Sequence, residues 1–319
     1  MSQAPRDEMP SIAILGPTCS WKTDLAINLA LHLQGEVISC DSMQVYRGLD
    51  VGTAKPSPET RTRVPHHLID ILDISERFDA SSFMAHAREA EKGIRGRGHV
   101  PILAGGTGLY ARAFVYGLQM LPARRSLSSQ LETQFSSATG PQELRRELLN
   151  WAHADRSEVP NDALVNPRRL LRAVEVLRLT GAPPWKHHTK SKELGYACRQ
   201  IVILPGNGVM RQRIGARTKE MLENGWIEET RTLVGNGLLA SPTARQALGY
   251  AEIAEFLRLG RGNSLSALCE RIVSRTMKFA RRQKTWFKHQ HPGAKTLNIE
   301  DPQTTVRTLT TAILETLSV

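Results

Sequence analysis

The stretch SIAILGPTCSWKTDLAINLALHL, residues 11–33, decides the fold of this 319-residue chain. Residues 11–15 form a short apolar run typical of a buried β-strand, and residues 22–33 repeat leucine every fourth position, as one face of a helix does. A glycine-containing loop joins the two. A strand, such a loop and a helix in this order predict a phosphate site, because successive backbone N–H groups and the helix N-terminus then point at one anion.

The loop fits the phosphate-binding pattern G-x-x-x-x-G-K-[ST] at Gly16, Lys22 and Thr23, but Trp21 stands where the second glycine belongs. The alternative is a strand-to-helix turn with a chance Lys-Thr pair. An indole at this position must point away from the phosphates or reshape the loop, because glycine adopts strained backbone conformations more easily than other residues. We expect the second outcome: Lys22 and Thr23 are displaced, affinity for a phosphorylated ligand is impaired, and Trp21→Gly improves it.

Further strand and helix signals extend the pattern outward. EVISCD (36–41) and HVPILAGG (99–106) are buried-strand candidates, and residues 81–94 have helical spacing. This alternation predicts an α/β fold, a P-loop NTPase-like parallel sheet flanked by helices. Asp41 and Thr107 follow two of the strands, so both are expected at the carboxyl edge of the sheet, where such sheets bind ligands. A carboxylate there serves as a general base or binds a magnesium water, while the simpler alternative is a helix N-cap.

The order of these signals also predicts the domains. After residue 122 the sequence turns helical and basic, and QIVILPG (200–206) has the composition of a strand that returns to the sheet. We expect the first part of a P-loop core over residues 1–122, a helical insertion over 123–197, and a return to the core followed by a basic helical region over 198–319.

The basic excess lies entirely in the later segments. Residues 1–122 hold 12 Lys/Arg against 13 Asp/Glu, residues 123–200 hold 13 against 8, and residues 201–319 hold 17 against 10. Their net charges are therefore −1, +5 and +7 within the total of +11. This asymmetry predicts a polyanion bound by the later segments, and the alternative is a merely solvated basic surface.

Several classes of protein are not indicated. The N-terminus MSQAPRDEMP is polar with acids, and no apolar run of 18 residues is present, so we expect a cytoplasmic protein without a membrane span. The four cysteines, Cys19, Cys40, Cys198 and Cys269, form no C-x-x-C pair. We therefore expect reduced thiols and neither a zinc site nor a disulfide framework.

Longer motifs carry a family resemblance. DSMQVYRGLDVGTAKP (41–56) and GGTGLY (105–110) stand with GPTCSWKT, NPRRLLRAVEVLRLTG, RIGARTKEMLENGWIEET, ALGY and ARRQKTWF. The order of these motifs and their approximate spacing, over nearly the whole chain, resemble those of the tRNA dimethylallyltransferases, also called tRNA isopentenyltransferases or IPP transferases.

The resemblance implies a transferase acting on tRNA. It implies transfer of the dimethylallyl group from dimethylallyl diphosphate to N6 of the adenosine 3′ of the anticodon, position 37, in tRNAs reading codons that begin with U, with release of diphosphate. It further implies Mg²⁺, contact with the anticodon stem-loop, and action as a monomer.

The resemblance also implies the site residues. Asp41 is the matching base for the amine proton, and Thr107 is its hydrogen-bond partner. The diphosphate would be bound by Gly16, Pro17, Thr18, Cys19, Ser20, Trp21, Lys22, Thr23 and Arg217, with Thr23 also on the metal. The tRNA would be contacted by Asp41, Ser42, Met43, Gln44, Thr107, Arg168, Arg169, Arg172, Gly249, Tyr250, Arg275, Arg281, Arg282, Gln283 and Trp286.

The last basic segment suits an RNA partner. The run RIVSRTMKFARRQKTWFK, which starts at Arg271, holds seven Lys/Arg and no acid. As a helix it presents cations on one face, backed by packing on the other, with Gln283 and Trp286 as base contacts; the alternative is an ordinary amphipathic helix. The cationic face would hold Arg271, Arg275, Lys278 and Arg282, and the packing side Ile272, Phe279 and Trp286.

Three positions depart from the family pattern. Ser129 stands where an arginine is usual, with Arg124 or Arg125 as candidate substitutes, Met277 stands where an arginine is common, and the third departure is Trp21. Two alternatives therefore stay open: a tRNA-binding relative with impaired catalysis, and a P-loop kinase or an isopentenyltransferase acting on free adenine nucleotides. No cysteine follows HQHP in the sequence, so we expect no C-terminal zinc finger.

Overall fold

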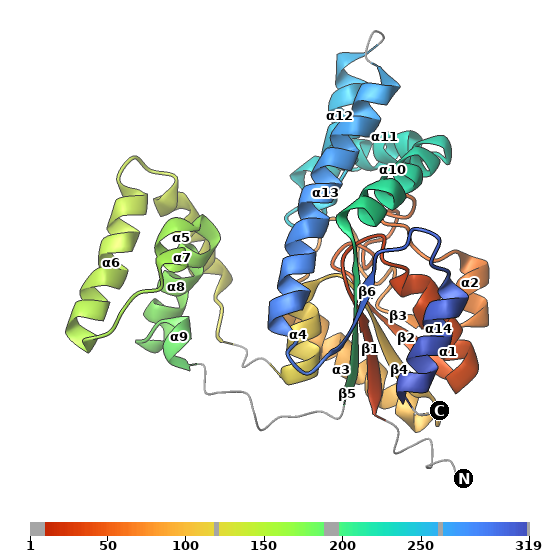
Figure 1. Cartoon of the computed structure of the whole chain (residues 1–319). Coiled ribbons are helices and arrows are strands. Elements are labelled where there is room, and N and C mark those ends of the chain that lie inside the picture. The colour runs from red at the N-terminus through yellow and green to blue at the C-terminus, as the bar shows by residue number, and fades with distance from the viewer. Residues whose placement is uncertain (1–9, 118–120, 188–197, 261–263, 318–319) are drawn as a thin grey trace. The chain divides into compact units, whose positions relative to one another are not determined.

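The chain forms two compact units in the computed structural model (Figure 1). The first contains residues 1–116 and 195–319, and the second contains residues 117–194. The structure describes residues 10–117, 121–187, 198–260 and 264–317. The limits of the predicted helical insertion, 123 and 197, lie within a few residues of the ends of the second unit.

The first unit is an α/β fold. Strands and helices alternate along the chain up to α4, and the unit continues with β5 after the second unit. In order they are β1 (Ser11–Leu15), α1 (Lys22–Leu33), β2 (Gly35–Cys40), α2 (Pro58–Arg63), β3 (His66–His67), α3 (Ala80–Gly96), β4 (Val100–Gly105), α4 (Gly108–Tyr116), β5 (Cys198–Pro205), α10 (Asn207–Glu223), α11 (Trp226–Gly235), the 3₁₀ turns η2 (Leu238–Ala240) and η3 (Ala244–Gln246), α12 (Tyr250–Leu259), α13 (Leu265–Gln290), β6 (Lys295–Ile299) and α14 (Val306–Leu317).

The six strands form one parallel sheet in the order β3-β2-β4-β1-β5-β6. β1 lies between β4 and β5, with Ile14 beside Ala104 on one side and Ile201 on the other. Because all strands run the same way, the loops that follow β1, β2 and β4 meet at one edge. The predicted fold class is confirmed.

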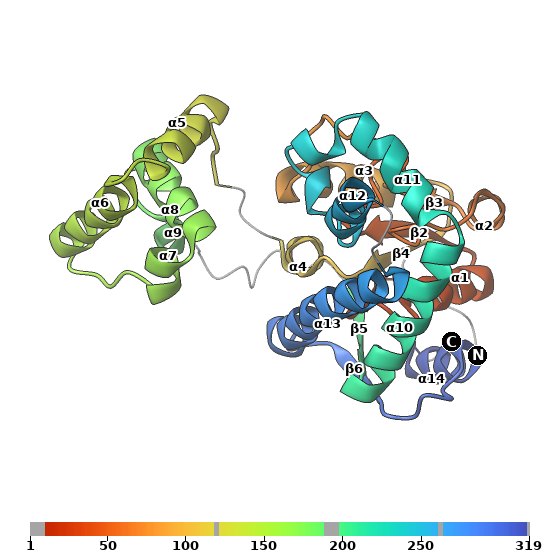
Figure 2. The same ribbon diagram turned by 90° about the horizontal axis from the view of Figure 1, so that it is seen from above.

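Each face of the sheet is covered by its own set of helices (Figure 2). Alternate residues of β1 point to opposite faces, so Ile12 and Ile14 pack with α1 and α14, whereas Ala13 and Leu15 pack with α3, α4 and α13. Every residue of β1 is buried, as expected for a parallel strand covered on both faces. Helices α10 and α11 lie beyond the carboxyl ends of the strands (Figure 1).

The second unit is helical. Its elements are α5 (Arg125–Phe135), α6 (Gly140–Asp155), α7 (Asn161–Val165), α8 (Pro167–Thr180) and α9 (Pro184–His187). A separate core forms between α5, α6 and α8, from Leu131, Leu144, Leu148, Leu170 and Val174. Helix α8 ends in a glycine C-cap: Gly181 has a left-handed backbone with φ of 80°.

One residue of helix α13, Phe279, does not lie on the side of the helix that was predicted for it. The buried side chains of this helix are Leu268, Ile272, Met277, Ala280, Gln283 and Phe287, whereas Phe279 stays partly exposed beside Arg282. The reason is that α10 packs along the Met277 and Ala280 side through Met210 and Ile214. The placement of Phe279 on the packing side was therefore wrong.

Among the residues that the structure describes, no helix combines the length and apolar composition that a membrane span needs.

Candidate active site

The loop after β1 has the shape of a phosphate cradle. Gly16 approaches the Ile203 carbonyl so closely that any Cβ would collide with it, so glycine is required here. Ser20 Oγ donates to the Pro17 carbonyl at 2.8 Å, and Lys22 Nζ donates to the same carbonyl and lies 3.3 Å from Ser20 Oγ. The lysine side chain thus lies back along the loop, where the phosphates of a ligand would be held.

Lys22 has an altered proton affinity. Burial, joined by the charge of Arg217 and against opposing effects of Cys19 and Asp41, lowers the pKa of its ammonium from 10.5 to about 8. An anion bound next to the ammonium would stabilise its charged form and raise the pKa again. Proton uptake by Lys22 is therefore expected to accompany anion binding.

Trp21 takes the left-handed conformation that a glycine would adopt, with φ of 61° and ψ of 6°. Its indole is 6% exposed, packs in the core with Leu25 and Val209, and lies under the guanidinium of Arg213, 3.8 Å from the ring centroid. The side chain therefore points away from the phosphate side. Helix α1 still begins at Lys22, and the space between α1 and α10 accommodates the indole, which argues against the expected displacement of Lys22 and Thr23.

Asp41 and Thr107 follow the ends of β2 and β4, which lie next to each other and, through β4, next to β1 and its loop. Thr107 Oγ1 accepts a hydrogen bond from the Ser42 amide at 3.0 Å, and the Thr107 amide donates to the Cys40 carbonyl at 3.1 Å. Asp41 Oδ1 accepts from the Met43 amide at 2.8 Å. A turn and not a helix follows Asp41, so this residue is no helix N-cap.

Gln283 joins the two glycine loops of the site. Its Oε1 accepts from the Thr18 amide at 2.9 Å, and its Nε2 donates to the Gly106 carbonyl at 2.8 Å. The side chain is buried and both of its ends form hydrogen bonds within the protein, and its role as a base contact stays a prediction. Trp286, one turn further on α13, packs against the backbone of Gly108 and is only partly exposed.

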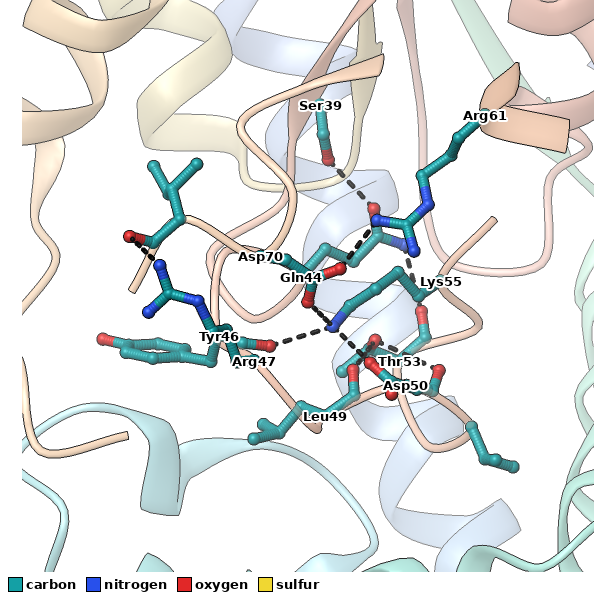
Figure 3. Close-up of polar contacts among 12 residues, drawn as sticks. Ser39, Gln44, Tyr46, Arg47, Leu49, Asp50, Thr53, Lys55, Arg61 and Asp70 are labelled. Atoms are coloured by element: carbon teal, nitrogen blue, oxygen red, sulfur yellow. Dashed lines mark hydrogen bonds and ion pairs between the residues drawn. The ribbon is translucent and has the colours of Figure 1, made fainter. Parts of the chain in front are cut away.

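Gln44 and Lys55 hold the segment after β2 together (Figure 3). Gln44 Oε1 accepts from Ser39 Oγ at 2.9 Å, and its Nε2 donates to the Thr53 carbonyl at 3.1 Å. The Gln44 side chain is therefore bonded within the protein, and its contact with tRNA stays a prediction. The ammonium of Lys55, whose side chain is 2% exposed, pairs with Asp50 at 2.5 Å.

The same segment is tied to α11 by Glu229. This carboxylate accepts from the amides of Asp50, Val51 and Gly52 at 2.7 to 3.1 Å and from the Tyr250 hydroxyl at 2.6 Å. Burial and the Glu229 charge raise the pKa of Tyr250. Gly249 is also buried, and a Cβ there would collide with the indole of Trp226. The Tyr250 side chain packs in the core and donates to Glu229, and a contact of this residue with tRNA stays a prediction.

The predicted tRNA-facing arginines differ in their availability. Arg275 pairs with the mostly buried Glu252 of α12, so its charge is already compensated. Arg281 and Arg282 are exposed on α13, and within the described ranges neither makes an ion pair.

In the second unit, the arginines of α8 also have partners. Arg169 forms an ion pair with Asp162, and Arg172 pairs with Glu175 at 2.6 Å. Arg172 also donates to the Leu121 carbonyl at 2.8 Å, so it anchors the start of this unit. The backbone of Arg168 is capped by the side chain of Asn166.

The three departures from the family pattern have different surroundings. Ser129 is exposed on α5, and Arg124 and Arg125 are exposed close by. Met277 is buried with Cys19 behind the phosphate loop. Arg217 of α10 matches the pattern, and its Nη1 lies 3.6 Å from Cys19 Sγ, beside the loop.

A parallel α/β sheet whose phosphate loop, carboxylate and hydroxyl share one edge defines the class: a P-loop-type protein built to act on a phosphorylated substrate. The description "IPP transferase" belongs to a family model that matches residues 44–290, and an "isopentenyl transferase" model matches residues 9–70. The chain belongs to the IPP transferase family.

Curated relatives support this membership. The tRNA dimethylallyltransferase of Kocuria rhizophila is 39% identical over 294 residues, which cover 92% of this chain and 91% of the relative. That of Thermus thermophilus is 40% identical over 291 residues, which cover 89% and 91%.

Solved structures agree in fold. The crystal structure of the full-length tRNA isopentenylpyrophosphate transferase from Bacillus halodurans is 33% identical with a TM-score of 0.67, and the match covers 97% of both chains. A eukaryotic dimethylallyltransferase acting on tRNA is 25% identical with a TM-score of 0.81, and the match covers 95% of this chain and 77% of the other.

Proposed function

We propose that this chain transfers the dimethylallyl group of dimethylallyl diphosphate to N6 of adenosine 37 in tRNAs that read codons beginning with U. One observation carries the proposal: an anion-binding loop, the carboxylate of Asp41 and the hydroxyl of Thr107 follow three adjacent parallel strands. The reaction needs these three groups together, for the leaving group, the amine proton and the position of the amine. The names of the relatives support the same activity.

The phosphate loop would bind the diphosphate of the donor. Its amides, the ammonium of Lys22 and the guanidinium of Arg217 would stabilise the negative charge that develops as the allylic C–O bond breaks. Because burial disfavours the charged form of Lys22, a bound diphosphate would restore an ammonium at this site.

Thr23 fits the role of a magnesium ligand. It lies in the first turn of α1, its side chain is exposed, and in the described part of the chain its hydroxyl makes no hydrogen bond. Mg²⁺ takes few protein oxygens and keeps several waters and phosphate oxygens, so one hydroxyl beside a diphosphate is a suitable donor set. When bound, the ion would neutralise part of the diphosphate charge.

Asp41 and Thr107 would act on the acceptor. The exocyclic amine of adenine is a weak nucleophile, so it must be held against the allylic carbon and lose a proton as the new C–N bond forms. Asp41 would take this proton, and the Thr107 hydroxyl, oriented by the Ser42 amide, would position the amine. The base must leave its stack in the anticodon loop to reach such a site.

The exposed cations would hold the RNA. Arg281 and Arg282 of the first unit are suited to phosphates of the anticodon stem-loop because no acid of the described residues pairs with them. Since the substrate is tRNA, the reaction is expected in the cytoplasm.

The test is transfer of labelled dimethylallyl diphosphate to tRNA that lacks the modification, with AMP and ATP as parallel acceptors. The proposal predicts label in tRNA alone and its loss in Asp41→Asn, a variant that keeps an acceptor oxygen for the Met43 amide. Label in AMP or ATP would favour the free-nucleotide enzyme. Binding of tRNA without transfer would favour a relative with impaired catalysis.

A further inference from the structure

Two residues of the phosphate loop other than glycine have left-handed backbones. Cys19 has φ of 60° and Trp21 has φ of 61°. Residues with a Cβ are strained in this region, so a loop that contains two of them needs support from its surroundings. A glycine at the second position would remove one of these two strains.

Arg213 of α10 contacts both strained residues. Its Nε donates to the Cys19 carbonyl at 2.9 Å, and its guanidinium lies over the Trp21 ring, 3.8 Å from the centroid. A planar guanidinium suits this double contact, because its face stacks on an aromatic ring while its N–H groups donate in the plane. The indole is 6% exposed, so its ring is shielded from water, while Arg213 is half-buried.

We propose that Arg213 is a positioning residue that stacks on Trp21 and thereby holds the phosphate loop in its anion-binding shape. In this chain the pair of Trp21 and Arg213 takes the place of the second loop glycine. Arg213 uses its Nε and one face on the loop itself, so its contribution to binding passes through the loop and not through a contact with the diphosphate.

Arg217, on the same helix, can be compared with Arg213. It lies one turn further along α10, and its Nη1 reaches the Cys19 side chain at 3.6 Å. The proposed function assigns Arg217 to the diphosphate, whereas Arg213 is assigned to the loop. The same helix therefore presents two arginines to one loop for different purposes.

Apolar side chains also pack against the phosphate loop at Cys19. The Cys19 side chain is buried with Met210, Ile214 and Met277. Both Trp21 and Met277 therefore lie behind the loop, and Arg213 is the charged group that spans its two strained residues.

The test is a double-mutant cycle on the full chain, with inorganic pyrophosphate and Mg²⁺ as the probe in calorimetry. It rests on the proposed function only for the choice of a diphosphate. Arg213→Gln is expected to weaken pyrophosphate binding by about tenfold in the natural chain and less than about threefold in the Trp21→Gly chain. Arg217→Gln, the matched control, should weaken binding by the same factor in both chains.

Two results would overturn the proposal. An equal loss from Arg213→Gln in both chains would make Arg213 a direct ligand of the diphosphate, and no loss in either would leave it a packing residue. Arg213→Lys keeps the charge but not the planar face, so it should recover little affinity. If the glutamine variant does not fold, the lysine variant serves in the same cycle.

Failure of this inference differs from failure of the proposed function. Pyrophosphate binding with dimethylallyl transfer to tRNA, but without coupling between Trp21 and Arg213, would reject the inference alone. Coupling without transfer would reject the proposed function alone. A natural chain that does not bind pyrophosphate would reject both.

Discussion

The pH dependence of donor binding follows from Lys22. Burial lowers the pKa of its ammonium to about 8, so the ligand-free protein loses this proton as the pH rises through 8. A bound diphosphate stabilises the charged form, so binding takes up a proton above pH 8. The dissociation constant of dimethylallyl diphosphate should stay nearly constant below pH 7.5 and rise by about tenfold between pH 7 and pH 9.

The free energy of unfolding of the ligand-free protein depends on pH in the opposite direction to donor affinity. The unfolded chain keeps the Lys22 proton up to about pH 10.5, whereas the ligand-free folded chain releases it from about pH 8. Between these values the unfolded state binds more protons, so the contribution of Lys22 to the free energy of unfolding increases with pH. Donor binding and the stability of the ligand-free protein should therefore change in opposite directions over this range.

Calorimetric titration of dimethylallyl diphosphate without tRNA, at five pH values from 6.5 to 9.5, measures the effect. Lys22→Arg is the matched control, because arginine stays charged throughout and should give a flat profile over this range. A dissociation constant of the natural chain that stays flat from pH 7 to pH 9, like that of the control, would refute the assignment of Lys22 as a buried, titrating diphosphate ligand.

Three other predictions use separate measurements. Asp41→Asn should lower single-turnover transfer by roughly 10²–10⁴-fold and leave tRNA affinity within a few-fold, and near-normal transfer would remove Asp41 from the chemistry. Arg281→Ala and Arg282→Ala should each reduce the slope of log affinity for tRNA against log salt by up to about one. Arg275→Ala should change this slope less, because its charge is already paired with Glu252. Slopes that equal that of the natural chain in all three variants would reassign α13 to packing. Trp21→Gly should lower the free energy of unfolding by roughly 2–4 kcal/mol in denaturant titrations, because a buried indole is lost and only part of that loss is offset by relief of backbone strain, while diphosphate affinity changes less than about threefold. A large gain in affinity would restore the expectation that the indole damages the loop.

The central part of the fold could be predicted because its signals are local. β1, its loop and α1 appear in the sequence as an apolar run, a glycine and spaced leucines, and the structure begins and ends them at the predicted residues. By contrast, β6 was missed because only Ile299 of this edge strand is buried, so no apolar run marks it.

The positions of polar side chains were harder to predict. Gln283 lies in a basic amphipathic run and has the composition of a surface residue, yet it joins two loops that are 177 and 265 residues away in sequence. Tyr250 resembles an exposed aromatic contact, but its partner Glu229 comes from another helix. Arg213 could have been noticed, because it stands four residues before Arg217 on the same helical face.

The conformation of Trp21 could not be deduced from the loop pattern. The pattern gives the cost of a side chain in a left-handed backbone, but not the space between α1 and α10 that receives the indole. That space depends on how the two helices pack, which is a property of the whole first unit.

The most direct test of the central claim is the identity of the modified nucleoside. Undermodified tRNA that reads codons beginning with U would be incubated with the protein, Mg²⁺ and dimethylallyl diphosphate, then digested and analysed by mass spectrometry. We expect N6-dimethylallyladenosine in the fragment that contains position 37, and none with Asp41→Asn. An unmodified position 37 with the natural protein, while the same tRNA binds it, would show that the protein is not a dimethylallyltransferase acting on this tRNA.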